Sequence, residues 1–236
     1  KQVLVGGVPS GAMVMFDHPV RQGNTARRGV PSIGGVSLFN GNFLHQVTDM
    51  AVPGKGPAFT LSRSYNSYSW TEEGRRGGVN ECRPWRFNWE VRVGWVQPAD
   101  GEGFALRSQL FVERPDGSGA TFFRHTDGLW YPMDQGNFDK VEVTASQVIV
   151  RGRDGLTHTF SNPDVNGGRL LSIVDEHGQG FLLTYGTNQK VASVRDSNGL
   201  SYLFRYDAYQ RLQEVRNQGR AGSDLLAVRY VWARQT

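Results

Sequence analysis

A chain of 236 residues can form one domain or two small ones, and its single cysteine excludes a disulfide framework within the chain. The formal net charge is +4, but acidic residues are interleaved with the basic ones, so we expect no nucleic-acid surface. No apolar run approaches the ~18 residues of a membrane-spanning helix, and we expect no membrane span. The 30 glycines and 11% aromatic residues favour strands and turns, which predicts an all-β fold.

The first third of the chain divides into an irregular lead-in and a region with strand signals. Glycine and proline recur too often in residues 1–35 for long elements, so we expect loops and short strands there. Asn40-Gly41 is a tight-turn signal with apolar residues on both sides, and Val52–Pro57 is a second turn. The residues after this turn share one parity and predict one face of a strand: Phe59, Leu61, Arg63 and Tyr65.

The middle of the chain predicts further strands. Residues 69–84 are polar and glycine-rich and are interpreted as an exposed loop. Residues 85–96 alternate strictly, with apolar residues at the odd positions, which predicts one continuous strand. Two hairpins are expected next, with turns at Pro115–Gly119 and at Asp154-Gly155. No window of about 12 residues has a helical period, so no long helix is expected.

The last third repeats at a spacing of 21 residues. Leu170, Val191 and Leu212 follow one another at this interval, and many other positions match at the same interval. Each unit predicts a β-hairpin, with a glycine that supplies the positive φ of its turn. Because one hairpin is barely stable alone, we expect stacked antiparallel hairpins in a curved, open sheet. The structural positions are Leu170, Asp175, Gly178, Phe181, Tyr185, Val191, Asp196, Gly199, Tyr202, Phe204, Tyr206, Asp207, Leu212 and Tyr230.

The C-terminal segment is expected to need a neighbour. Leu225–Trp232 is apolar on both faces, and no cap follows it. An unprotected apolar strand aggregates or pairs with another strand. We therefore expect either that the natural polypeptide continues past Thr236 or that this edge meets a partner, for example through self-association.

The repeat units resemble the YD repeats of the Rhs family. The fullest copy contains Asp196–Gly199, Tyr202, Tyr206-Asp207 and then Arg211-Leu212. A second resemblance is to the domain that opens the shell in many bacterial Rhs proteins, and it rests on three stretches: Asn40–Asn42 with Asp49, Pro53–Pro57 with Leu61–Ser67, and Pro84–Trp89. With this resemblance, the expected organisation is a lead-in at 1–35, an opening domain at 36–145 and hairpin repeats at 146–236.

The resemblance implies a function in containment. Rhs proteins wind a long β-sheet into a hollow cocoon that encloses a C-terminal toxin for delivery to other cells, and teneurins and insecticidal toxin complexes use related shells. The implied partners are the rest of the shell, the enclosed toxin and secretion-system or chaperone proteins at the N-terminus. The implied location is secretion or delivery after synthesis in a bacterial cytoplasm. Neither the family's self-cleaving core motif nor a toxin domain is found in the sequence, so catalysis, a cofactor and a metal are not expected.

A search for catalytic patterns gives weak candidates only. Cys82 beside Arg83 could be an activated thiol, but a lone thiol near a loop is the simpler interpretation. Asp175 and Asp196 could line a groove as in a glycosidase, although repeated turn capping is the better interpretation. The histidines have no metal-ligand spacing. They are His18, His45, His125, His158 and His177.

Two other classes of function stay open at this point. The first is a module that binds glycan or a surface protein through exposed aromatic rings, for which Trp70, Trp85, Trp130 and Trp232 are candidates. The stripe Trp85, Phe87, Trp89 and Trp95 is expected to be a core face instead, because sheets bury residues of period two. The second is a hydrolase, which requires two carboxylates within about 5–10 Å of each other. The arginine pairs at 27–28 and 75–76 are interpreted as solvated loop charges.

Overall fold

The computed structural model describes eight stretches of the chain: residues 32–33, 35–37, 43–66, 85–96, 106–114, 119–134, 136–219 and 224–231. Most of the predicted lead-in lies outside the described residues, as do Asn40-Gly41, the loop at 69–84, Cys82, Trp70, Trp232 and both arginine pairs. The first described elements are β1 (Ser32–Ile33) and β2 (Val36–Ser37), a short antiparallel pair. No helix in these stretches is long and apolar enough to cross a membrane.

A three-stranded antiparallel sheet follows β1 and β2. It consists of β3 (Leu44–Val52), β4 (Phe59–Asn66) and β5 (Trp85–Phe87), with β4 in the middle. The predicted turn at Val52–Pro57 joins β3 to β4. Phe59 and Leu61 are buried, at 2% and 0% exposure, so the predicted parity marks a core face in the first half of β4. In the second half Arg63 and Tyr65 are partly exposed, and the buried side chains are those of Ser62 and Ser64.

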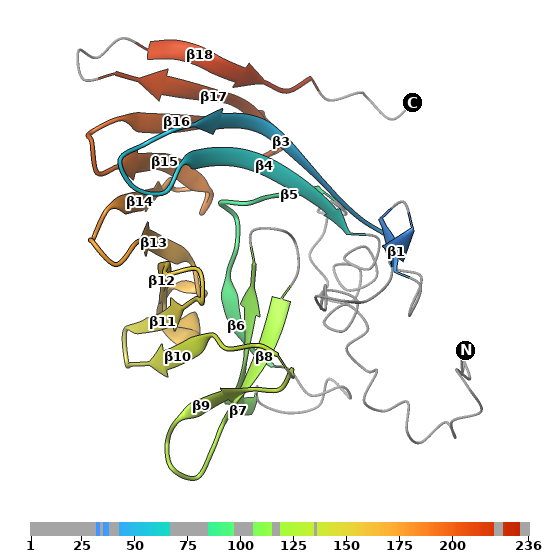
Figure 1. Cartoon of the computed structure of the whole chain (residues 1–236). Coiled ribbons are helices and arrows are strands. Elements are labelled where there is room, and N and C mark those ends of the chain that lie inside the picture. Colours follow the sequence, from blue (N-terminus) through green and yellow to red (C-terminus); the bar gives the residue numbers. More distant parts are fainter. Residues whose placement is uncertain are drawn as a thin grey trace.

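The other described strands form one 13-stranded antiparallel sheet, in which each strand is hydrogen-bonded to the next in chain order. Figure 1 shows that this sheet is strongly curved and that the three-stranded sheet lies inside the curve. The predicted fold class, stacked antiparallel hairpins in a curved and open sheet, is confirmed. The strands are β6 (Val93–Val96), β7 (Leu106–Glu113), β8 (Gly119–Arg124), β9 (Trp130–Pro132), β10 (Lys140–Val143), β11 (Gln147–Arg151), β12 (Thr157–Ser161), β13 (Leu170–Val174), β14 (Gly180–Tyr185), β15 (Val191–Asp196), β16 (Ser201–Tyr206), β17 (Leu212–Gln218) and β18 (Asp224–Arg229).

The single strand predicted for residues 85–96 is wrong. The chain forms β5, turns at Asn88–Glu90, where the Glu90 N–H donates to the Phe87 carbonyl at 2.9 Å, and then enters β6 in the other sheet. Phe87, Trp89, Val91 and Val93 are nevertheless all buried. The alternation of apolar residues therefore identified buried side chains from Phe87 to Val93, but it continued through a turn that separates two sheets.

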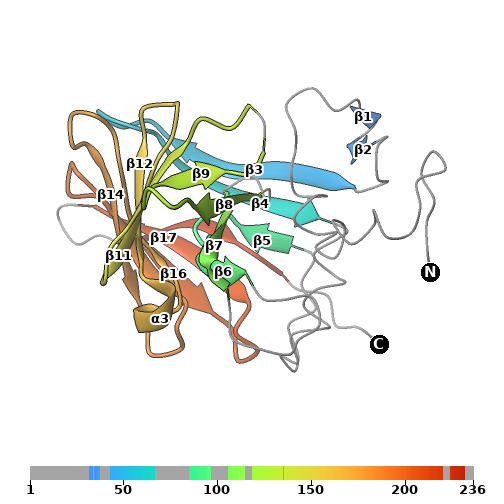
Figure 2. The ribbon, with the colours of Figure 1, turned by 90° about the horizontal axis from the view of Figure 1, so that it is seen from below.

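A short helix, α3 (Pro163–Asn166), lies between β12 and β13. The Asn162 side chain caps it by accepting a hydrogen bond from the Asp164 N–H at 2.9 Å, and Pro163 occupies the first turn. Figure 2 shows this helix at the border of the sheet, away from the three-stranded sheet. Its four residues are too few to produce a helical period, so the sequence pattern did not indicate it.

The first strand of the large sheet returns to touch its middle. The Val93 N–H donates to the Gly168 carbonyl at 2.8 Å, and Arg92 and Arg169 form an isolated antiparallel bridge. Gly168 has a φ of 65°, and a Cβ atom at this position would lie 1.8 Å from the Val93 carbonyl oxygen. Only glycine fits this contact, which holds β6 to β13 without closing the sheet.

Six hairpin turns of the large sheet share one backbone pattern. In each, the first N–H bonds to the fifth carbonyl, the fourth N–H bonds to the first carbonyl, and the fourth residue has a positive φ. This is a type I turn followed by a residue in the left-handed region. The turns span residues 125–129, 152–156, 175–179, 186–190, 196–200 and 207–211. Glycine occupies the fourth position in four turns, whereas Gln189 and Gln210 occupy it in the other two.

Candidate functional site at the junction of the two sheets

The most extensive contact between distant parts of the chain is an aromatic cluster between the two sheets. The Phe59 ring of β4 stacks on the Tyr202 ring of β16, with centroids 3.5 Å apart and planes within 5°. Trp89 stacks on Phe59 from another side at 5.2 Å, and Phe181 of β14 meets both rings edge-on. All four side chains are at most 4% exposed. The three-stranded sheet and the turn that follows it therefore pack directly against the inner side of the repeat hairpins.

The glycine-rich loop between β3 and β4 lies on the turns of the repeat hairpins. A Cβ atom on Gly56 would be 2.6 Å from the Gln179 Cβ and 3.2 Å from an Asp175 carboxylate oxygen. Together with Gly54, it lines a void of about 10 Å³ that is bounded on the other side by Phe181 and Asn198. Such close approach explains why this loop needs glycine rather than any residue with a side chain.

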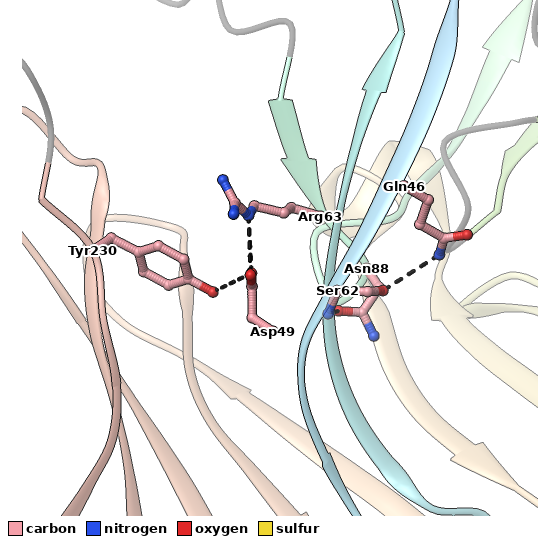
Figure 3. Close-up of polar contacts among 6 residues, drawn as sticks. All are labelled: Gln46, Asp49, Ser62, Arg63, Asn88 and Tyr230. Carbon is pink, nitrogen blue, oxygen red and sulfur yellow. Dashed lines mark hydrogen bonds and ion pairs between the residues drawn. The ribbon is translucent and has the colours of Figure 1, made fainter. Parts of the chain in front are cut away.

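A polar clasp joins the three-stranded sheet to the end of β18. The Arg63 Nε donates to both oxygens of the Asp49 carboxylate, at 3.2 and 3.0 Å, and the Tyr230 hydroxyl donates to Asp49 Oδ2 at 2.7 Å. Figure 3 shows the Asp49 side chain between the other two. The Arg63 guanidinium also lies 5.0 Å from the Trp85 ring centroid, and Phe87 meets Tyr230 edge-on at 5.2 Å.

A β-bulge aims Asp49 into this clasp. Thr48 pairs with Ser62 and Met50 pairs with Leu61, so Asp49 is an extra residue in β3 with no partner in β4. A bulge redirects a side chain and increases the local twist of its strand. The Asn88 side chain, just after β5, connects this strand to β4. Its oxygen accepts a hydrogen bond from the Ser62 N–H at 2.9 Å, and its amide group donates to the Thr60 carbonyl at 2.9 Å.

The electrostatic setting of the clasp favours a neutral phenol. Burial, together with the hydrogen bond to Asp49, raises the pKa of Tyr230 well above its usual range. Burial likewise raises the pKa of Tyr185 to about 12. An ion pair joins the repeat region to the turn after β5: Lys190 Nζ lies 3.9 Å from a Glu90 carboxylate oxygen, and both side chains are mostly shielded from solvent.

The repeat positions predicted from the sequence occupy three structural positions: the first residue of a turn, the fourth residue of a turn, and the buried inner face of a strand. Asp175, Asp196 and Asp207 are the first residues of their turns, and each Oδ1 accepts two backbone N–H bonds at 2.8 or 2.9 Å. Gly178 and Gly199 are fourth residues with a φ of 74° and 88°. The buried positions on the inner face are Leu170, Phe181, Val191, Tyr202, Phe204 and Leu212.

The tyrosines that end the units form a ladder, which the third unit breaks. The Tyr185 hydroxyl donates to the Leu170 carbonyl at 2.7 Å, and the Tyr206 hydroxyl donates to the Val191 carbonyl at 3.0 Å, 15 residues back in both cases. Tyr230 ends the third unit but bonds to Asp49, 181 residues away. The structure thus brings Phe181, Tyr202 and Tyr230 to the junction, whereas the other repeat positions hold the hairpins to one another.

The remaining sequence candidates lie apart from one another. No group of three or more metal-ligating side chains occurs in the described part of the chain. His45, His125 and His177 are exposed, whereas the partly buried His158 pairs in register with Val150 and Ile173, and burial lowers its pKa. Trp85, Trp95 and Trp130 are partly buried, and Trp89 is in the core.

Sequence reasoning missed the residues that make the junction specific. Asp49 entered only as part of a family resemblance, and Asn88, Glu90 and Lys190 did not enter as contacts at all. One local signal was present: an acidic residue inside a strand pattern, where β-propensity is low, is a sign of a bulge. No local signal indicates which distant residue such a side chain meets.

The fold and the junction define a class of β protein in which consecutive hairpins curve around a smaller sheet. The aromatic cluster around Phe59 and the polar clasp at Asp49 hold the two sheets together. Residues 34–122 match a family model described as a domain of unknown function, DUF6531. The chain is also similar to tRNA nuclease WapA of Bacillus subtilis (strain 168), with 24% identity over 156 residues. It is 25% identical over 156 residues to the tRNA3(Ser)-specific nuclease WapA of Bacillus spizizenii. Both matches cover 66% of this chain, which spans about 6% of the length of these relatives.

Proposed function

We propose that this chain is a structural segment of a toxin-enclosing β-shell of the Rhs type and that it carries out no catalysis itself. Its role is containment: the curved sheet forms part of the wall, and the three-stranded sheet seals one end of the enclosed space. The toxin and the remaining wall belong to other parts of a longer polypeptide, which is secreted or delivered to a competing cell.

The observation that carries this proposal is the stack of Phe59 on Tyr202. A wall built from repeated hairpins needs an end, because an open curved sheet would expose its apolar inner face to water. Here that face is covered from β14 to β18 by a unique sheet that precedes the repeats in the chain. The similarity to much longer nucleases supports a toxin-related protein in which this segment has a role other than the nuclease reaction.

The charged groups of the repeat turns and of the clasp also support a structural role. The carboxylates of Asp175, Asp196 and Asp207 each accept two backbone N–H bonds in a turn. Asp49 is bonded to Arg63 and Tyr230. Groups that are engaged in this way stabilise turns and fix strand positions, and they are poorly placed to exchange protons with a substrate.

The test uses the complete natural polypeptide that contains this segment. Phe59→Ala should open the sealed end, so we expect faster proteolysis of the enclosed domain and greater toxicity to the producing cell. Tyr209→Ala is the matched control, because it removes an aromatic ring that is 75% exposed on a repeat turn. Unchanged protection of the enclosed domain in the Phe59 variant would contradict the proposal, and so would a natural polypeptide that lacks further repeats and a C-terminal cargo domain.

A further inference from the structure

The outer face of the β8–β9 hairpin carries an exposed apolar surface that the shell role does not use. Figure 1 shows this hairpin at the end of the molecule farthest from β18. Leu129, Tyr131 and Met133 are 60%, 39% and 57% exposed. Tyr131 lies in β9, and the other two residues flank this strand at alternate positions, which place them towards the same face. Phe123 is paired in register with Tyr131, and the ring of His125, in the turn after β8, contacts both rings. We call Phe123, His125, Leu129, Tyr131 and Met133 the hairpin patch.

The aromatic rings of the hairpin patch are in mutual contact. Tyr131 lies 6.0 Å from Phe123 and 5.7 Å from His125, centroid to centroid, and Phe123 lies 6.4 Å from His125. The His125 ring is nearly perpendicular to that of Tyr131, at 84°. The result is a small aromatic platform with one imidazole at its rim.

Asp127 fixes this platform in place before any ligand arrives. Its Oδ1 accepts from the Leu129 N–H at 2.8 Å, which holds the turn, and its Oδ2 accepts from the Tyr131 hydroxyl at 2.9 Å. The same Oδ2 lies 3.3 Å from His125 Nδ1. A rigid arrangement lowers the conformational entropy that a ligand must otherwise offset on binding.

Folding does not require apolar residues on this face. The opposite face of the same strands provides the core contacts, with Phe122 at 0% exposure and Trp130 packed against the core. Polar residues are the ordinary choice for the solvent face of an antiparallel sheet. An exposed apolar surface on a solvent-facing strand marks an interaction site when it is contiguous and ordered.

We propose that the hairpin patch binds neutral pyranose sugars of a surface glycan. The C–H face of a sugar ring is apolar and fits an aromatic platform, while its hydroxyls can bond to the Asp127 carboxylate and the His125 imidazole at the rim. This goes beyond the proposed shell function and does not depend on it. It would give the segment a means of recognising the surface of another cell.

Other ligand classes fit the hairpin patch less well. A stable protein partner needs about 800 Å² on each side, far more than one hairpin tip offers. An anionic lipid surface or an acidic sugar requires clustered cations. Arg124, beside the patch in sequence, alternates to the other face of β8, and the Asp127 carboxylate at the rim of the patch is negative.

The test is a titration of the 236-residue chain with a glucose tetrasaccharide and an N-acetylglucosamine tetrasaccharide, monitored by backbone NMR. We expect saturable shifts confined to residues 121–133, with dissociation constants of roughly millimolar order, as a shallow site gives. Tyr131→Ala should weaken binding about tenfold. Asp127→Asn should weaken it severalfold while keeping the turn, because an amide oxygen can still accept from the Leu129 N–H.

The controls distinguish the hairpin patch from general stickiness of exposed rings. Tyr209→Ala removes the 75% exposed ring on another turn and should leave binding unchanged. Sialyllactose and phosphatidylglycerol vesicles should not bind, because both are anionic. The proposal is overturned if neither neutral tetrasaccharide causes shifts at about 10 mM, far above the expected dissociation constants. It is equally overturned if Tyr131→Ala binds like the parent, or if only the vesicles bind.

Discussion

The repeat hairpins of β13–β18 and the three-stranded sheet of β3–β5 are both antiparallel, yet they are stabilised in different ways. In the repeats, one set of contacts recurs every 21 residues: an aspartate that caps a turn, a left-handed fourth residue and a tyrosine bonded to a carbonyl. In the three-stranded sheet each important contact occurs once. Phe59 has one aromatic stack, and Asp49 has one clasp.

This difference teaches where the chain is most sensitive to substitution. Loss of one repeated contact leaves its copies intact in neighbouring units, because each hairpin contacts only the next ones. A contact that occurs only once has no copy elsewhere to compensate for its loss. Its loss also weakens the connection between the two sheets. The following changes test this contrast, from the largest expected effect to the smallest.

The largest effect is expected at the aromatic stack. Phe59→Ala and Tyr202→Ala should each lower the free energy of unfolding by about 3–5 kcal/mol, because each leaves a cavity in a close-packed cluster. Urea denaturation followed by circular dichroism measures both. The double variant should lose less than the sum of the two, by about 0.5–1.5 kcal/mol, since the rings contact each other.

Phe204→Ala provides the matched control for that cycle. Phe204 is 7% exposed on the inner face of β16, and its removal should also cost about 3–5 kcal/mol. It makes no ring contact with Phe59 in the described structure, so its effect should add to that of Phe59→Ala. Equal coupling of both pairs would show that the stack is not a distinct contact.

The second effect is a loss of stability at alkaline pH. The folded chain holds the Tyr185 phenol neutral, with its pKa raised to about 12, whereas the unfolded phenol ionises near a pKa of 10.0. Its contribution is therefore fully present below about pH 10 and is lost as the pH rises towards about 12. Tyr185→Phe should flatten this decline in unfolding free energy, by about 2 kcal/mol over that range.

Tyr209→Phe tests whether that flattening is specific. Tyr209 lies on the turn at 207–211 with 75% of its surface exposed. Its substitution should leave the slope of stability against pH unchanged. If both variants flatten the decline to the same extent, burial of Tyr185 is not its cause.

The third effect concerns the polar clasp. Asp49→Asn removes the charge that Arg63 and Tyr230 both contact and should cost about 1–2 kcal/mol, as expected for partly shielded charge-assisted hydrogen bonds. Thermal unfolding at two salt concentrations measures it. Glu142→Gln, in an ion pair with Arg151 at 3.2 Å that is half exposed, should cost less than about 0.5 kcal/mol. Similar losses in the two variants would argue against a special role for Asp49.

The smallest effects are expected in the repeat turns, where one substitution should raise the free energy of unfolding and another should lower it. Gln210 has a φ of 60°, so Gln210→Gly should relieve backbone strain and stabilise the chain by about 0.5 kcal/mol after the entropy of glycine is counted. Gly178→Ala, at a φ of 74° with open space around it, should cost about 1 kcal/mol. Chemical denaturation resolves the two signs. Destabilisation by Gln210→Gly would show that the hydrogen bond from Asn188 to Gln210 outweighs the strain.

The sequence predicted the hairpins well because their signals are local. Asp175, Gly178 and Phe181 lie within seven residues of one another, and the 21-residue spacing repeats the pattern. The turn at Asp154-Gly155 and the hairpin of β11 and β12 were found for the same reason. The predicted boundary between residues 145 and 146 lies between β10 and β11, which are neighbours in one sheet.

The junction could not be predicted because it depends on contacts that are distant in sequence. Nothing near Phe59 indicates Tyr202, and nothing near Asp49 indicates Tyr230. The error at residues 85–96 has a related cause. Trp89 is buried between the two sheets, so alternation persists through a turn where the backbone changes sheet.

The position of Tyr230 has a consequence for how such a chain can change in length. Duplication or loss of a whole 21-residue unit would preserve every turn and every tyrosine-to-carbonyl bond, and genes can acquire such changes by unequal recombination. Between Tyr202 and Tyr230, however, an added unit would carry Tyr230 two strands away from Asp49. The contact of Tyr230 with Asp49 therefore fixes the number of hairpin units that can lie between Tyr202 and Tyr230.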